Sequence, residues 1–309
     1  MITGEHIDVD SLIGQPSQTV FIEPYLFFYD RFDGKSITMV DVNKKSIYKR
    51  FLKEGHGPGE IIPPLKLFVS DDNTLNVFQL QTGALLSYKL SSLLDASILP
   101  SPHSKVMFKD RPAILSKAKD GFVGIGMFEK GRFQLYDDDG NDIKVIGSYP
   151  FDGDNMNPIN RFFRYQGTLC SSPDGKHFAM GSAYCDNLEF WEVTDNHNAV
   201  LTHKYESYDV KGSFNGTIRL DDECVMNYKG AYGTNRYCYM LYAGEKYGEK
   251  HKRTTGGKII LKFDWNGNYI KTFQTESNIY SFCVDNKDRT IYGITKDETS
   301  GFVLKSYKL

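Results

Sequence analysis

The chain has 309 residues, a formal net charge of −2 at pH 7 and 14% aromatic residues. Because positive charge is not in excess, no basic field is present to hold a phosphate backbone, which argues against nucleic acid as a partner. The sequence contains no run of about 18 apolar residues, so it predicts no transmembrane segment.

One strand pattern returns six times, at intervals of about 50 residues. Each copy is an apolar run that leads through a turn or loop into a second apolar run. The first runs are Phe27–Asp30, Val77–Leu80, Val123–Gly126, Ala179–Ser182, Met240–Ala243 and Tyr292–Thr295. Turns rich in Asp, Asn and Gly recur at matching places and favour tight reversals. The pattern predicts an all-β, six-bladed β-propeller with four-stranded antiparallel blades, as a single domain over residues 1–309.

The last copy of the repeat lacks its outer strand. Phe302–Tyr307 is its third strand, and the chain stops at Leu309. Near the other end, His6–Asp10 alternates apolar and polar residues. We expect this segment to pair with the C-terminal strand and complete the last blade, because closure removes an open sheet edge.

Two regions depart from the repeat. Leu90–Leu99, rich in Ser and Leu, is expected to hold a short helical turn. The fifth blade is expanded by Ser207–Asp222 and by a long connection, Gly244–Gly257. Long loops in a tight repeat are common binding sites, so the basic residues of the second connection are candidates for ligand binding. The connection contains Lys246, Lys250, His251, Lys252 and Arg253, of which His251 and Arg253 are the candidate binding residues. The alternative interpretation is a solvated loop without a ligand.

Gly55–Glu60, with the sequence Gly-His-Gly-Pro-Gly-Glu, stands between the first and second blades. It lacks the Lys-Ser/Thr pair and the following helix of a phosphate-binding loop. His56 and Glu60 are candidate binding residues, and the alternative is a rigid connector between blades.

Asn160–Tyr165 precedes the inner strand of the fourth blade and places two arginines among aromatic residues. Such a group can bind a carboxylate or sulfate, which makes Arg161, Arg164 and Tyr165 candidate binding residues. The alternative is that the arginines form salt bridges between blades.

Signatures of catalysis and metal binding are missing from the sequence. The histidines lack HxH and HExxH spacing, and no Gly-x-Ser-x-Gly motif occurs. Asp137–Asp142 is acidic but has neither Gly nor Glu where a calcium loop needs them, so it is interpreted as a hairpin turn. We therefore predict no catalytic residue, no metal ligand and no cofactor.

The five cysteines form no CxxC pair and are predicted to be buried free thiols. Within single blades, Cys170 could lie near Cys185, and Cys224 near Cys238.

Several of these segments together resemble the TolB-like six-bladed β-propeller proteins of bacterial envelopes. The resemblance lies in Gly55–Glu60, Tyr237–Gly244, Ile259–Asn268, Val284–Asp285 and Thr290–Gly293. It implies an exported, periplasmic or extracellular protein, often lipid-anchored, with no assigned activity and no catalytic residues to transfer. Met1–His6 is not a signal peptide, so the chain either starts in the cytoplasm or lacks its export signal and anchor.

The leading hypothesis is a non-enzymatic recognition module of the cell envelope that binds a glycan, a peptide or a partner protein. The first alternative is an enzyme with its site in the central channel, either a metal-dependent lactonase-like hydrolase or a polysaccharide lyase. The second alternative is a structural scaffold in an envelope complex, which an exposed apolar patch would favour.

Overall fold

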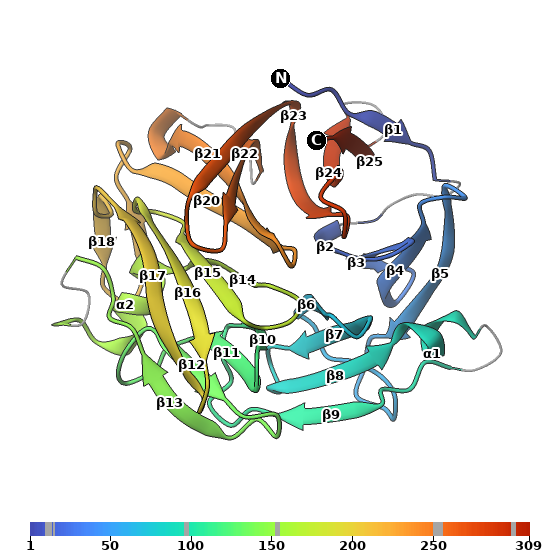
Figure 1. The fold of residues 1–309 in the computed structure, drawn as a ribbon, viewed down its shortest axis with the longest axis horizontal. Helices are drawn as coiled ribbons and strands as arrows, with labels where there is room; N and C mark the ends of the chain where they lie inside the picture. The colour runs from blue at the N-terminus through green and yellow to red at the C-terminus, as the bar shows by residue number, and fades with distance from the viewer. Residues whose placement is uncertain (10–13, 15, 96–98, 152–154, 250–255, 298–300) are drawn as a thin grey trace. The chain divides into compact units, whose positions relative to one another are not determined.

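A computed structural model describes residues 1–9, 14, 16–95, 99–151, 155–249, 256–297 and 301–309. Within these ranges the chain is built mainly from antiparallel strands (Figure 1). Two compact units are present. The first unit comprises residues 1–111 and 275–309, and the second unit comprises residues 112–274.

The first unit begins with two four-stranded antiparallel sheets whose strands follow one another in chain order. One sheet contains β2 (Pro16–Ile22), β3 (Tyr25–Phe32), β4 (Lys35–Asp41) and β5 (Ser46–Lys53). The other contains β6 (Leu65–Ser70), β7 (Thr74–Gln79), β8 (Ala84–Lys89) and β9 (Ser104–Met107). The helical turn expected in Leu90–Leu99 is present as helix α1 (Leu90–Leu94).

The N-terminal strand completes the last sheet, as the incomplete final repeat predicted. β1 (Glu5–Ile7) pairs antiparallel with β25 (Gly301–Lys308), with Ile7 opposite Leu304, and β25 pairs with β24 (Thr290–Asp297). Both chain ends lie at this sheet (Figure 1). Glu276 anchors the strand, because its Oε1 accepts hydrogen bonds from the Gly4 backbone N at 3.2 Å and from Lys305 Nζ at 2.9 Å.

The second unit contains three successive sheets. The first has β10 (Ile114–Ala118), β11 (Gly121–Ile125), β12 (Phe133–Tyr136) and β13 (Asp142–Ile146). The second has β14 (Gly167–Ser171), β15 (His177–Ser182), β16 (Asn187–Thr194) and β17 (Asn198–Glu206). The third has β20 (Val225–Gly233), β21 (Tyr237–Lys246), β22 (Gly257–Asp264) and the long strand β23 (Tyr269–Val284), whose residues from 275 on belong to the first unit. Because β23 also pairs with β24, these four strands are continuous with β24, β25 and β1 in one seven-stranded sheet.

Helix α2 (Pro158–Tyr165) precedes β14, and a hairpin of β18 (Gly212–Phe214) and β19 (Ile218–Leu220) lies in the segment Ser207–Asp222. The repeat did not predict this hairpin. The connection expected at Gly244–Gly257 is shorter than predicted, because β21 continues to Lys246 and a 3₁₀ turn, η2 (Tyr247–Glu249), follows it.

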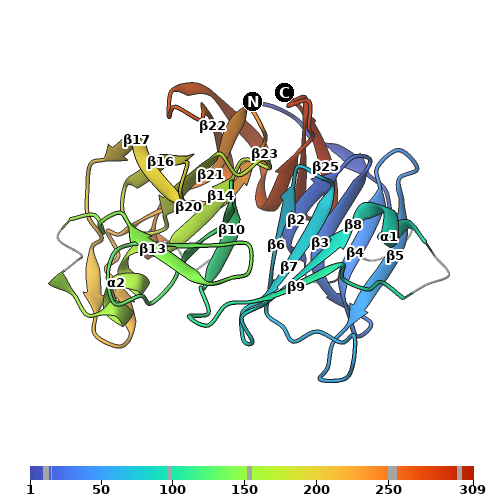
Figure 2. The same ribbon diagram turned by 60° about the horizontal axis from the view of Figure 1, so that its bottom comes forward.

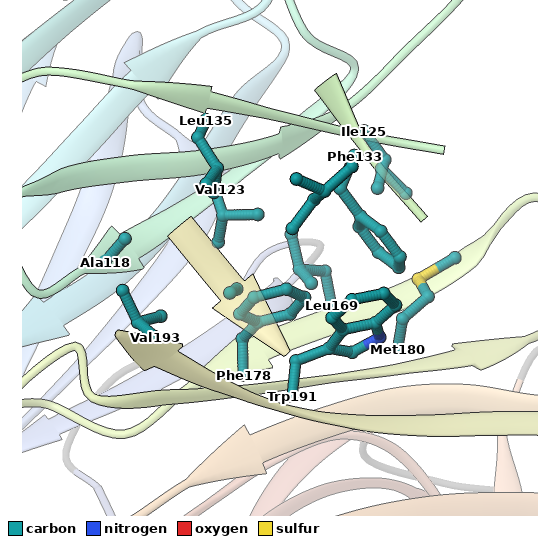
Figure 3. Close-up of a cluster of buried hydrophobic side chains, with 12 residues drawn as sticks. Ala118, Val123, Ile125, Phe133, Leu135, Leu169, Phe178, Met180, Trp191 and Val193 are labelled. Atoms are coloured by element: carbon teal, nitrogen blue, oxygen red, sulfur yellow. The ribbon is translucent and has the colours of Figure 1, made fainter. Parts of the chain in front are cut away.

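The core between the first two sheets of the second unit is made of alternating inward-facing residues (Figure 3). Phe178 and Trp191 stack with ring centroids 5.8 Å apart and an interplanar angle of 4°. Phe133, from the neighbouring sheet, meets the Trp191 ring edge-on at 5.4 Å. These aromatic contacts hold the two sheets together, because strand alternation sends every second side chain into the interface.

The acidic segment Asp137–Asp142 forms a turn, as predicted. Asp137 Oδ1 accepts hydrogen bonds from the backbone N of Asp139 at 3.0 Å and of Asn141 at 2.8 Å. Hydrogen bonds from Asn141 hold the pKa of Asp137 below its usual value. The carboxylate therefore stabilises the reversal between β12 and β13.

All five cysteines are buried and free. The proposed neighbours within single blades were wrong. Cys170 contacts Cys238, with the two Sγ atoms 3.7 Å apart, whereas Cys185 and Cys224 belong to a different apolar cluster. Side chains of neighbouring sheets face each other in the core, and spacing along the chain does not reveal which ones meet.

Candidate functional site

Helix α2 carries three of the predicted binding residues, Arg161, Arg164 and Tyr165. The helix begins after Asn157, whose side chain accepts a hydrogen bond from the backbone N of Asn160 at 2.9 Å. Pro158 occupies the first turn, where a missing backbone N–H costs nothing. These local signals account for a helix between two sheets of an otherwise all-β chain.

Arg161 is 4% exposed. One guanidinium nitrogen, Nη2, donates to the backbone O of Phe128, and the guanidinium carbon lies 5.3 Å from the centroid of the Tyr149 ring. Its Nε is buried and has no hydrogen-bond acceptor among the residues that the structure describes. A buried donor without an acceptor is costly, and the Nε of Arg132 is in the same situation.

A hollow of about 560 Å³ lies beside Arg161. Residues 129–131, before β12, and residues 145–148, at the end of β13, line it with Arg161. Figure 2 shows α2 and β13 on the same side of the second unit. The hollow therefore combines one buried arginine with two chain segments at the rim of a sheet.

The two chain segments are held by Arg132, whose backbone N donates to the carbonyls of Ile146 at 3.2 Å and Gly147 at 3.1 Å. Gly131 has φ of +60°, and a Cβ there would lie 2.2 Å from Val145 Cγ1, so glycine is favoured at this position. Glu129, Lys130 and Ser148 are exposed at the hollow. With Arg161 and Lys130 positive and Glu129 negative, these side chains carry a formal charge of +1.

Arg164 and Tyr165 make contacts within the protein. Arg164 Nη2 donates to Asp209 Oδ2 at 2.6 Å, and its Nε donates to Tyr165 Oη at 3.1 Å. Burial lowers the pKa of Arg164, but the hydrogen bond to Asp209 offsets this, and the net pKa is raised. Tyr165 is buried and donates to the backbone O of Phe151 at 3.3 Å, and burial raises its pKa. Both residues thus fix α2 in place.

A buried ionic network that the sequence did not indicate is centred on Arg132, the residue that follows Gly131 of the hollow. Arg132 Nη1 contacts Glu189 Oε1 at 2.5 Å and Asn187 Oδ1 at 2.6 Å, while Nη2 donates to Ser182 Oγ at 2.8 Å. The Arg132 and Glu189 side chains are only 1% and 3% exposed. The network links the start of β12 to β15 and β16 and so supports the Gly131 segment of the hollow.

In the first unit, the predicted residues His56 and Glu60 lie in the connector after β5. Glu60 Oε2 accepts from the Gly57 backbone N at 2.8 Å, and Oε1 pairs with Lys53 Nζ at 2.9 Å. The hydrogen bond from Lys53 holds the pKa of Glu60 below its usual value. These contacts agree with the connector interpretation of Gly55–Glu60, and His56 is exposed beside them.

The remaining predicted residues, His251 and Arg253, lie outside the described residues. Nowhere in the described ranges do three or more His, Cys, Asp or Glu side chains form a group that could hold a metal ion. Among the same residues, no helix is long and apolar enough to cross a membrane.

Comparison with known proteins shows which family this chain belongs to. A sequence model described as "TolB-like 6-blade propeller-like" matches residues 40–287. The chain belongs to this family. Its successive four-stranded antiparallel sheets are therefore the blades of a six-bladed β-propeller, and the expected fold is confirmed. No curated protein matches the TolB-like chain by sequence.

Solved structures share the fold of this TolB-like protein at low sequence identity. A "Putative exported protein" of Bacteroides fragilis is 11% identical with a TM-score of 0.60, over 99% of this chain and 94% of that one. A member of the DUF4221 family from Bacteroides vulgatus is 12% identical with a TM-score of 0.62, over 100% and 96%. The Cps50 (Swd1) β-propeller domain of Myceliophthora thermophila is 10% identical with a TM-score of 0.51, over 97% and 98%.

Proposed function

We propose that this TolB-like protein is a non-enzymatic recognition module of the bacterial cell envelope, located in the periplasm or outside the cell. Its family membership supports this proposal, as does the exported character stated in the name of the Bacteroides fragilis structure. Propellers commonly present loops at the blade ends to a partner, and here one such edge is hollowed.

The hollow of the second unit binds a carboxylate, carried by an acidic glycan or by a peptide. The observation that carries this proposal is the position of Arg161, a buried arginine that lines the hollow together with Lys130. A ligand carboxylate would pair with the guanidinium of Arg161, and Lys130 would add a second positive charge at the rim. Glu129 disfavours ligands that place a second negative charge next to it.

The test is to titrate the purified protein with three classes of ligand of similar length. Calorimetry measures the binding, and thermal unfolding measures its effect on stability. The three classes are uronic acid oligosaccharides, acidic peptides, and neutral oligosaccharides. We expect one of the acidic classes to bind and to raise the unfolding midpoint, because a ligand that binds only the folded chain stabilises it. Binding of neutral sugars alone would contradict the proposal.

Two variants locate the binding. Arg161→Met is expected to weaken the acidic ligand roughly 10-fold or more, since a charged hydrogen bond in a buried position is lost. Lys130→Gln changes an exposed side chain, should fold normally, and should weaken binding by about 3-fold. Lys109→Gln, at an exposed lysine of the first unit, is the matched control and should leave affinity unchanged. If Arg161→Met and Lys130→Gln bind the ligand as tightly as the control Lys109→Gln, the ligand binds outside the hollow.

A further inference from the structure

Two cysteines of neighbouring blades meet in the core of the second unit. Cys170 lies on β14, opposite Ala179 of β15, and Cys238 lies on β21, opposite Phe263 of β22. Their Sγ atoms are 3.7 Å apart. Both side chains are buried in one apolar cluster that joins the two sheets. A separation of 68 residues along the chain thus becomes direct contact between two sulfurs.

We propose that Cys170 and Cys238 form a disulfide bond between these two blades when the chain folds in an oxidising compartment. The Sγ atoms, 3.7 Å apart as thiols, need to approach by roughly 1.7 Å to reach bonding distance. The bond depends on the envelope location proposed above, because the cytosol keeps thiols reduced.

The contact selects one pair among the five cysteines. Cys185 and Cys224 lie in a different apolar cluster, and Cys224 Sγ contacts the backbone O of Tyr184 at 3.6 Å. Cys283 lies in the first unit and is buried. Within the described residues these three make no sulfur–sulfur contact, so they should remain thiols.

The oxidant is a disulfide such as oxidised glutathione. The thiolate of one cysteine attacks the glutathione disulfide, forms a mixed disulfide and releases one reduced glutathione. The second cysteine, after losing its proton, attacks the protein sulfur of that mixed disulfide and releases the other reduced glutathione. Two cysteine thiols are thereby oxidised to one protein disulfide, and one glutathione disulfide is reduced to two thiols.

The disulfide is expected to form during folding and not in the folded protein. Complete burial raises the pKa of Cys238 well above its ordinary value, so the reactive thiolate is scarce once the core has formed. The bond therefore forms as the two blades come together, before the two thiols are fully buried. Folded, reduced protein should resist the same oxidant.

The experiment is a disulfide map of the full chain. The protein is unfolded with reductant and refolded either with a glutathione redox mixture or with dithiothreitol, free thiols are alkylated, and digests are read by mass spectrometry without reduction. In the glutathione sample we expect one linked peptide pair, containing Cys170 and Cys238, with Cys185, Cys224 and Cys283 alkylated. The linked form should unfold about 5 °C or more above the reduced form, because the bond restricts the unfolded chain.

Two outcomes would overturn the proposal: alkylation of all five cysteines after oxidative refolding, or a link that joins a different pair. A Cys238→Ala chain is the control, and it should show no link and the same unfolding midpoint in both refolding conditions. The disulfide map requires no ligand, so the absence of the link would not contradict the proposed binding site. Equally, a titration that shows no ligand binding would not contradict the disulfide.

Discussion

At the scale of single residues, burial changes the chemistry of side chains that the sequence shows as ordinary. The His177 ring stacks on Trp265 of the neighbouring blade, with centroids 5.6 Å apart and planes at 15°. Burial lowers the pKa of His177, although the carboxylates of Asp174 and Glu192 act in the opposite direction. The folded protein therefore holds this imidazole in its neutral form more strongly than the unfolded chain does.

This shift predicts a loss of stability in weak acid. The unfolded chain protonates His177 near pH 6.5, whereas the folded chain does so only at lower pH. Between these two pKa values the unfolded state binds more protons, so the free energy of unfolding falls as the pH drops below about 6.5. The measurement is urea unfolding at pH 7.5 and 5.5 for the wild type and for His177→Gln.

The loss of stability between pH 7.5 and 5.5 is compared in the wild type and in His177→Gln, and the difference gives the contribution of His177 apart from the other histidines. His177→Gln is expected to be less stable at pH 7.5, because it loses the stacked ring, but to lose less stability on acidification. The same decrease in both chains would show that His177 does not titrate differently on folding.

At the scale of elements, the blades of the second unit are joined by polar as well as apolar contacts. The pair of Arg132 and Glu189 connects the start of β12 to β16, and Trp191 Nε1 donates to Glu189 Oε2 at 3.1 Å. Charged groups removed from water are tolerated only when each has its partners, so the members of this network depend on one another.

Removal of one charge from the network should therefore be costly. Glu189→Gln leaves the buried Arg132 guanidinium without its carboxylate and is expected to lower the free energy of unfolding by about 3 kcal/mol or more. The exposed Glu192→Gln on the same strand is the control and should change stability by no more than about 0.5 kcal/mol. Urea midpoints at unchanged m-value measure both effects. A Glu189→Gln chain as stable as its control would show that the network is not needed.

At the scale of the whole molecule, the chain is a six-bladed propeller whose last blade borrows its outer strand from the N-terminus. β1 covers the edge of β25, and Ile7 is buried against it. An uncovered strand edge exposes unpaired backbone groups that other chains can join. The N-terminal strand therefore serves both stability and solubility.

A chain lacking residues 1–9 is expected to lose about 2–4 kcal/mol of unfolding free energy, since it loses the buried Ile7 and the β1–β25 hydrogen bonds. It should also self-associate. Denaturant unfolding and light scattering measure the two effects. His6→Ala, at an exposed position of the same strand, should behave as the wild type. A truncated chain that remains monomeric and equally stable would refute the role of β1.

Local signals in the sequence were enough to predict the blades. The 50-residue period, the turn residues and the alternating segment His6–Asp10 each depend on neighbouring residues, so the strands, the turns and the β1–β25 pairing could be predicted. The same is true of the Asp137–Asp142 turn, whose hydrogen bonds close within a few residues. Helix α2 and the β18–β19 hairpin interrupt the repeat, and the period contains no information about them.

The sequence by itself determined the fold and proposed Arg161 as a binding residue. Only the tertiary structure decided what surrounds Arg161, which residues form the hollow, and which protein groups Arg164 and Tyr165 contact. It also decided that Arg132 meets Glu189, 57 residues away, and that Cys170 meets Cys238. The physical reason is that neighbouring blades present independent sheet faces to one another. Which side chains meet there depends on how whole sheets pack, and spacing along the chain does not encode it.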